Sequence, residues 1–422
     1  MLLCGILMGL IDYKLLKRLV NEHGTPFYVM FPDRYRQNLQ SFVAAFQKGY
    51  DRIIVGYSFK TNYLPKLCTI AKDEGCYAEV VSEMELELAI KLGFKDIIFN
   101  GPIKKGNAIK TAIENGAIIN LDAEYEVDSI CQFKREHPDK QIKIGLRLNV
   151  QLENEKGESA IQNGLRHGRF GFPHQVLRSN IEKLRAADID ICSLHGHTSS
   201  SDRAVYNYKI ITEYMLSIRK EFRMDSVKYF DIGGGFFGAA PFGLDVSGKP
   251  SYDDYAQMVL SILHNDPWFL KTQPYLVIEP GSSVVSNVFE YYTSIFQQKN
   301  IGTKRFVIVD GSVFDVKPTM HSFNLPFSLI PMSEAGNEQE DYGHCDIVGS
   351  TCMEKDVIMH DVRIPFFQRG DLINIKGVGA YTLSLTPTFI NYLAPVFTFE
   401  NEELVLVRRR QQIEDLLNIY LI

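Results

Sequence analysis

The sequence predicts an α/β fold, a parallel (β/α)8 barrel of the TIM type joined to an antiparallel β-domain. Between residues 51 and 280, eight short β-rich runs alternate with stretches of helical periodicity, which is the pattern of such a barrel. After about residue 285 the runs become short and β-type, and helical periodicity returns only near the C-terminus. We therefore expect a barrel over residues 29–284 and a β-domain made of residues 1–28 and 285–422.

The eight β-rich runs of the expected barrel lie at residues 51–57, 76–81, 96–101, 117–121, 142–149, 189–197, 227–235 and 275–281. Amphipathic stretches such as 174–187 separate them, and Ser82 and Glu85 fit a capping box at the start of another. A doubly wound open sheet would need a glycine-rich phosphate loop after its first strand, and none follows that run. In the β-domain we expect strands at 25–30, 305–313, 345–351, 356–366, 371–377 and 394–399, and a helix within 409–421.

Composition and charge restrict the class of protein. The chain has 422 residues, of which 45% are hydrophobic and 23% charged, as in an ordered globular protein of two domains. A net charge of -6 with both signs interspersed argues against a nucleic-acid partner. The seven cysteines form no C-x-x-C pair, which suits reduced thiols in the cytoplasm better than a disulfide framework.

The first residues, "MLLCGILMGLI", are apolar but short. They have no basic segment before them and no small-residue cleavage site, and they run into the charged pattern "DYKLLKRL". We therefore expect neither a membrane span nor an export signal. Met8 would serve as a start residue as well as Met1.

Polar residues and a run of glycines stand where four of the expected barrel strands end. They are Lys60, His195, His197, Asp231, Gly233, Gly234, Gly235 and Glu279. Because the carboxyl ends of all barrel strands meet at one rim, where barrel enzymes carry their catalytic loops, we expect these residues to share a site.

Each of these residues has a structural and a functional interpretation. A triple glycine is often a flexible turn, but after the seventh barrel strand it suits a phosphate, since its backbone N–H groups are uncovered. Lys60 is either a solvated strand end or an amine that forms a Schiff base with an aldehyde. Glu279 is either a core carboxylate or the group that keeps a proton on a pyridine nitrogen, and His197 either a core histidine or a ring-stacking group. Taken together, the functional interpretations indicate one cofactor, pyridoxal phosphate.

The competing interpretation of "HGH" is a metal site. His195 and His197 would share one face of a strand, and Glu279 could be a third ligand, as in barrel hydrolases. Such sites need further histidine or aspartate side chains at other strand ends, and the remaining histidines do not fall there. We therefore expect no metal.

The motifs resemble those of the pyridoxal-phosphate decarboxylases of the alanine racemase-like fold, fold type III, which include diaminopimelate, ornithine and arginine decarboxylases. The resemblance covers nearly the whole chain. The motifs are "YSFKTN" (57–62), "LHGHTSSSD" (194–202), "DIGGG" (231–235), "IEPG" (278–281), "VGSTCMEKD" (348–356) and "GAYT" (379–382).

The resemblance implies a role for each matching residue. Lys60 would carry the cofactor as a Schiff base, His197 would stack on its ring, and Glu279 would pair with the ring nitrogen. The phosphate would be held by Ser200, Gly233, Gly234, Gly235 and Tyr381. Cys352 would donate the proton that replaces the departing carbon dioxide. In this family the cysteine segment usually comes from the partner subunit, so the resemblance also implies a homodimer with shared sites.

The departures from the family pattern bear on the substrate. Relatives that act on diamino acids typically carry an acidic residue directly after the cysteine, to hold the distal ammonium, and here that residue is Met353. An unpaired buried cation would cost several kcal/mol, on the order of the desolvation of a charge. Glu354, one residue later, could take the role if the loop shifts. Lys317 stands where diaminopimelate decarboxylases usually carry a substrate-binding arginine.

Two more departures lie near the expected phosphate. Ser282 replaces the arginine that usually follows "EPG", and Ser199 replaces a glycine. We therefore expect a cytoplasmic decarboxylase of a small-molecule amino acid with an acylated, bulky or anionic distal group, as in siderophore or antibiotic assembly. Diaminopimelate or another basic amino acid is the alternative substrate. A racemase of the same fold and a non-catalytic regulator remain as rival functions.

Overall fold

The computed structural model describes residues 11–332, 342–365 and 367–421, and these form two compact units. The barrel unit comprises Arg36–Gly238 and Ser247–Val284. The β-domain unit comprises the residues up to Tyr35, the segment Ala239–Val246, and the residues from Val285 onward. The assignment of Ala239–Val246 to the β-domain unit was not predicted, because this short segment lies between two elements of the barrel.

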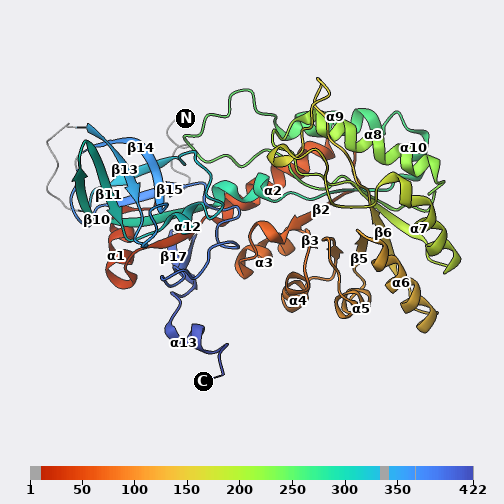
Figure 1. Ribbon diagram of the computed structural model, residues 1–422, viewed down its shortest axis with the longest axis horizontal. Coiled ribbons are helices and arrows are strands. Elements are labelled where there is room, and N and C mark those ends of the chain that lie inside the picture. The colour runs from red at the N-terminus through yellow and green to blue at the C-terminus, as the bar shows by residue number, and fades with distance from the viewer. Residues whose placement is uncertain (1–10, 333–341, 366, 422) are drawn as a thin grey trace. The chain divides into compact units, whose positions relative to one another are not determined.

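The barrel is closed by parallel strands, β2 to β9, each paired with its neighbours and with β9 returning to β2 (Figure 1). The strands are β2 (Ile53–Ser58), β3 (Tyr77–Val80), β4 (Ile97–Phe99), β5 (Ile118–Leu121), β6 (Lys143–Arg147), β7 (Ile191–His195), β8 (Tyr229–Asp231) and β9 (Tyr275–Ile278). All eight predicted runs form these strands, and the predicted fold class is confirmed. The strands are found readily because buried parallel strands are continuous apolar runs.

Helices follow the strands around the outside of the barrel (Figure 1). They are α3 (Pro65–Asp73), α4 (Glu83–Lys91), α5 (Gly106–Glu114), α6 (Glu124–Glu136), α7 (His174–Ala186), α8 (Val205–Glu221), α9 (Tyr252–Leu263), α10 (Pro267–Thr272) and α11 (Ser282–Val285). Helix α2 (Pro32–Gln47) precedes β2, the single turns η1 (Phe59–Thr61) and η2 (Gln162–Gly164) lie in loops of the barrel unit, and η3 (Ser286–Val288) lies in the β-domain unit.

The cap of α4 differs in detail from the predicted capping box. Ser82 accepts a hydrogen bond from the N–H of Glu85, as expected, at 3.2 Å. The Glu85 carboxylate, however, accepts the N–H of Val81 at 2.7 Å rather than that of Ser82. It thereby satisfies the backbone at the end of β3, so the side chain closes the strand as well as the helix.

The inside of the barrel is apolar near the start of the strands and polar near their carboxyl ends. Ile54, Ile98, Ile118 and Val277 form one buried cluster from β2, β4, β5 and β9. Toward the carboxyl ends the interior instead holds carboxylates, amides and imidazoles. This arrangement leaves polar chemistry at one end of the barrel only.

The β-domain unit is built on a mostly antiparallel sheet whose described strands run in the order β14-β13-β11-β10-β1-β16-β17, with β15 and β12 attached beside β10. Its elements are α1 (Tyr13–His23), β1 (Phe27–Met30), β10 (Phe289–Ile301), β11 (Lys304–Val309), α12 (Val313–Val316), β12 (Phe327–Ile330), β13 (Tyr342–Val348), β14 (Val357–Pro365), β15 (Leu372–Lys376), β16 (Val396–Glu400), β17 (Glu403–Arg408) and α13 (Ile413–Leu417). Its core includes Leu16 and Leu19 of α1 packed on Phe27, Tyr292 and Phe397.

Three strands of this unit, β10, β12 and β17, were not predicted. The first half of β10 is buried on both faces, so its residues do not alternate between polar and apolar. The predicted helix within 409–421 is also shorter than expected, because α13 holds only five residues, none of them buried, and a short exposed helix gains little from packing.

The structure also bears on the N-terminal prediction. Residues 1–10, on which that prediction partly rests, lie outside the described residues. Among the residues that the structure describes, no helix is both long and apolar enough to cross a membrane.

Candidate active site

Lys60 lies in η1, directly after β2, and its amine is held by a buried carboxylate. Its Nζ lies 2.8 Å from Oε2 of Glu79, which comes from β3 and is 1% exposed. The Ser58 hydroxyl donates a second hydrogen bond to the same oxygen. The Lys60 side chain is 32% exposed, so its amine is anchored but accessible.

Glu79 was not predicted as a site residue. It lies inside the apolar run 76–81, where a charged residue was the only signal that could have drawn attention to it. A carboxylate inside a buried strand needs partners, and here the partners are the lysine motif and a neighbouring amide.

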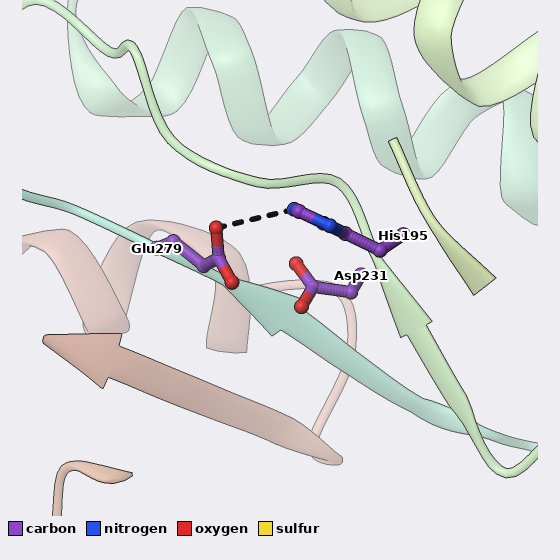
Figure 2. Close-up of side chains that lie close together, drawn as sticks. All are labelled: His195, Asp231 and Glu279. Carbon is purple, nitrogen blue, oxygen red and sulfur yellow. Dashed lines mark ion pairs between the residues drawn. The ribbon is translucent and has the colours of Figure 1, made fainter. Parts of the chain in front are cut away.

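Glu279, Asp231 and His195 converge at the carboxyl ends of β9, β8 and β7 (Figure 2). His195 Nε2 lies 3.4 Å from Glu279 Oε2, and Asp231 Oδ1 accepts the N–H of Gly233 at 2.9 Å. Burial would raise the pKa of Glu279, but His195 and Lys60 beside it hold that pKa below its usual range. Burial and the neighbouring Glu279 raise the pKa of Asp231 well above its usual range. The two shifts have opposite directions: they favour the charged form of Glu279 and the neutral form of Asp231.

His197 packs against the triple glycine. Its Nδ1 accepts the N–H of Gly234 at 3.0 Å, and a Cβ added to Gly233 would lie 2.5 Å from the His197 Cβ. Burial, with Arg147 and Lys60 nearby, lowers the pKa of His197 well below its usual value. The imidazole is therefore neutral and carries its proton on Nε2, which suits stacking on an aromatic ring.

The glycine loop can hold a phosphate through one of its N–H groups. The N–H groups of Gly233 and Gly234 donate to Asp231 and His197. Among the described residues no acceptor takes the N–H of Gly235. Gly235 has φ +97°, and a Cβ there would meet only the Tyr208 hydroxyl, at 3.6 Å. An exposed N–H on left-handed backbone with space beside it fits an anionic oxygen.

Ser200 and Ser199 lie on the loop after β7. The Ser200 hydroxyl accepts the N–H of Arg203 at 3.0 Å, and the carbonyl of Ser199 accepts the N–H of Gln162 at 2.9 Å. The hydroxyl of Ser200 still has its own proton to donate. Ser282 begins α11.

A network of buried charges supports the rim and was not predicted. Arg147, at the end of β6, binds Asp122 at 3.1 Å and donates to the carbonyl of His197 at 3.1 Å. The N–H of Asp122 in turn donates to Glu126, which is paired with Lys104 at 3.1 Å. These pairs join the ends of β4, β5 and β6 to the backbone of His197, after β7.

The remaining predicted residues lie in the β-domain unit. Lys317 ends α12 and is 3% exposed, and its Nζ donates to the carbonyl of Phe323 at 3.4 Å. Burial lowers the pKa of Lys317. Tyr381 follows β15 with φ +56°.

Cys352, Met353 and Glu354 lie on the loop between β13 and β14, which is organised by the buried Asp356. Its carboxylate accepts the N–H of Thr351 at 2.9 Å and that of Val313 at 2.7 Å. Cys352 is an exposed free thiol. All three predicted residues thus lie on a loop whose backbone is fixed by hydrogen bonds to Asp356.

The metal alternative of the sequence is wrong in its ligand set. Among the described residues the structure groups His195 and Glu279 with Asp231, within 4.8 Å of one another, rather than with His197. The His197 ring lies parallel to that of His195 at 6.2 Å and uses Nδ1 for the glycine loop.

The barrel and the residues at its rim are those of a pyridoxal-phosphate enzyme. Residues 36–286 match the family model of the pyridoxal binding domain of the pyridoxal-dependent decarboxylases. The chain belongs to this family. It is therefore a carboxy-lyase that uses pyridoxal 5′-phosphate, which the paired lysine, the ionised Glu279, the neutral His197 and the open Gly235 N–H fit.

Diaminopimelate decarboxylases are among the relatives that match most of the chain. The chain is 29% identical to that of Archaeoglobus fulgidus, over 86% of this chain and 84% of the relative, and 28% identical to that of Campylobacter jejuni, over 96% and 97%. Among solved structures it resembles the Helicobacter pylori diaminopimelate decarboxylase complexed with L-lysine, with a TM-score of 0.82, 24% identity and coverage of 96% and 98%. These likenesses favour the decarboxylase over the racemase and the regulator.

Proposed function

We propose that the protein decarboxylates diaminopimelate, or a closely similar basic amino acid, in a homodimer with shared sites. The observation that carries this proposal is that the chain matches diaminopimelate decarboxylases along nearly its whole length. This favours the alternative substrate over the conjugated amino acid that the departures at Met353 and Ser282 suggested.

The cofactor supplies an electron sink for the negative charge left on the α-carbon when carbon dioxide departs. The residues of this chain have separate tasks around it. Lys60 would hold the cofactor through its aldehyde, with Glu79 orienting the amine, and Glu279 would keep the proton on the ring nitrogen. The neutral His197 covers one face of the ring. Ser200 and the open backbone N–H of Gly235 would hold the phosphate, with Tyr381 as a further phosphate ligand, while Gly233 and Gly234 keep the loop in place through Asp231 and His197.

The β-domain residues supply the remaining groups. Cys352, from the partner subunit by the family resemblance, gives a proton to the α-carbon. Diaminopimelate has a distal carboxylate and a distal ammonium, and Lys317 and Glu354 have the complementary charges. Met353 packs beside the distal chain and leaves the ammonium to Glu354.

The test is carbon dioxide release in the presence of pyridoxal phosphate from meso-diaminopimelate, L-lysine, L-ornithine and an Nε-acylated lysine. We expect release from meso-diaminopimelate and none from the Lys60→Ala variant, which should also lack the visible absorbance band of the lysine Schiff base. Release only from the acylated substrate would contradict the proposal and restore the conjugated amino acid.

A second variant tests the distal subsite. Glu354→Gln should raise the KM for diaminopimelate by about tenfold, the loss expected for a hydrogen bond to a charged group, with a smaller change in kcat. Glu402→Gln removes an exposed glutamate of the same unit and is the matched control. Equal effects of the two variants would refute the assignment of Glu354.

A further inference from the structure

One buried amide joins the two carboxylates on which the site depends. Asn100, directly after β4, is 2% exposed. Its Nδ2 donates to Glu79 Oε1 at 3.0 Å and to Glu279 Oε1 at 2.7 Å. A side-chain amide has two N–H donors, and Asn100 donates both of them to carboxylates that come from two different strands.

The orientation of this amide is fixed from the opposite side. Asn120, on β5, donates its Nδ2 to Asn100 Oδ1 at 2.9 Å. A flipped Asn100 amide would turn its carbonyl oxygen toward both carboxylates and its N–H groups toward the Asn120 donor. Neither contact would be a hydrogen bond, so only one orientation satisfies the whole set.

The other oxygen of each carboxylate has a separate partner. Oε2 of Glu79 binds the Lys60 amine at 2.8 Å, and Oε2 of Glu279 faces His195 at 3.4 Å. Asn100 is therefore the link between the side chain that orients the lysine and the side chain that meets the ring nitrogen. A shift of either carboxylate would change the spacing that one rigid cofactor must span.

We propose that Asn100 is a positioning residue of the decarboxylase site: its amide fixes Glu79 and Glu279 relative to each other, and so sets the spacing between the Lys60 amine and the ring-nitrogen carboxylate. The inference rests on the proposed roles of Lys60 and Glu279. It adds to them a residue that touches neither cofactor nor substrate.

The experiment uses Asn100→Asp, which keeps the shape and the acceptor for Asn120 but replaces both donors by a third carboxylate. The matched control is Asn374→Asp, because Asn374 is another buried amide that donates to a buried carboxylate, Glu290, at 2.8 Å, but on β15 of the β-domain unit. For the purified full-length proteins, the dissociation constant of pyridoxal phosphate and the pH midpoint of its absorbance band are measured, together with the urea midpoint.

We expect Asn100→Asp to weaken cofactor binding by about tenfold or more, as for lost hydrogen bonds to charged groups, and to shift the pH midpoint of the band. The loss relative to wild type should be smaller at about pH 6 than at about pH 8.5, since a protonated aspartic acid recovers one donor. The titratable groups that face this position are Glu79, Glu279 and Lys60, with His195 and Asp231 beside Glu279.

Three outcomes separate the possibilities. In the first, Asn100→Asp binds pyridoxal phosphate and absorbs like wild type, and only its urea midpoint is lowered, as in Asn374→Asp. This result would make Asn100 a structural residue and overturn the inference. In the second, Asn100→Asp does not fold, and Asn100→Ser, which keeps a single donor, takes its place. This variant must then bind the cofactor more weakly and shift the pH midpoint of the absorbance band. An unshifted pH midpoint overturns the inference. A wild-type band that persists in Lys60→Ala would instead overturn the proposed function on which the inference rests.

Discussion

Replacing Lys104 by methionine should destabilise the barrel strongly, because it leaves a buried carboxylate without its cation. The side chains of Lys104 and Glu126 are both 0% exposed, with Nζ 3.1 Å and 3.4 Å from the two carboxylate oxygens. The amine also donates to the carbonyl of Gly101 at 2.8 Å. Burial lowers the pKa of Lys104, and Glu126 opposes that shift. Each ion thus depends on the other.

The magnitude follows from what remains after the substitution. Glu126 would keep two donors, the N–H of Asp122 at 2.8 Å and the hydroxyl of Tyr125 at 3.0 Å, but no positive charge. Breaking a buried pair by removing one partner costs about 3–5 kcal/mol, and we expect a value in this range for Lys104→Met. In the double variant with Glu126→Gln the amide oxygen can still accept the N–H of Asp122, and the amide N–H can donate to the Tyr125 hydroxyl, so most of the loss should be recovered.

The assay is urea unfolding followed by the fluorescence of Trp268, the one tryptophan of the chain, which lies on α10 in the barrel unit. Lys110→Met is the matched control, since Lys110 forms an exposed pair with Glu114 at 4.0 Å on α5 and should cost less than about 0.5 kcal/mol. A cost below about 1 kcal/mol for Lys104→Met, or a double variant no more stable than the single one, would refute the reasoning.

Three further perturbations have defined outcomes. Burial raises the pKa of Glu85 to about 7, above its ordinary 4.5, so between these two pH values the folded chain holds a proton that the unfolded chain has lost. The free energy of unfolding should therefore fall by about 3 kcal/mol as the pH rises from 4.5 to 7. Glu85→Gln should remove this slope when urea midpoints are measured against pH. Gly234→Ala would place a Cβ 2.2 Å from the carbonyl oxygen of Glu279, so it should lower the urea midpoint and weaken pyridoxal phosphate binding. In Gly106→Ala the added Cβ meets nothing within 4 Å, so this control should change neither property. Equal effects of the two variants would contradict the steric argument. Tyr208→Phe leaves the carbonyl of Gly234 without its donor at 2.8 Å, which should cost about 1–3 kcal/mol in the same unfolding assay; an unchanged midpoint would show that water replaces the hydroxyl.

The barrel and its rim could be predicted from sequence because both depend on local patterns. Buried parallel strands are apolar throughout, and barrel topology places their ends together without any knowledge of distances. Lys60, His197 and Glu279 were therefore visible as polar residues at strand ends. Glu79 was not, because it lies within a strand run and its importance comes only from the partners that the closed barrel brings to it.

The supporting residues could not be predicted for a related reason. Asn100 and Asn120 are common polar residues near strand ends, and nothing in the sequence shows that one amide donates to two carboxylates 21 and 179 residues away in the chain. The pairing of Arg147 with Asp122 is equally non-local. Strand β10 was missed because burial on both of its faces removes the alternation on which a half-exposed strand is recognised.

The loop between β13 and β14 separates the task of keeping its shape from the task of meeting a ligand. Asp356 takes the backbone donors, and a Cβ on Gly349 would lie 2.3 Å from its carboxylate, so these two positions tolerate little change. Positions 352 to 354 contribute side chains that the loop does not need for its own conformation. Residues 353 and 354 can therefore be exchanged, in evolution or in a library, while the backbone that carries Cys352 keeps its conformation; under the proposed function, such exchanges would change the preferred substrate.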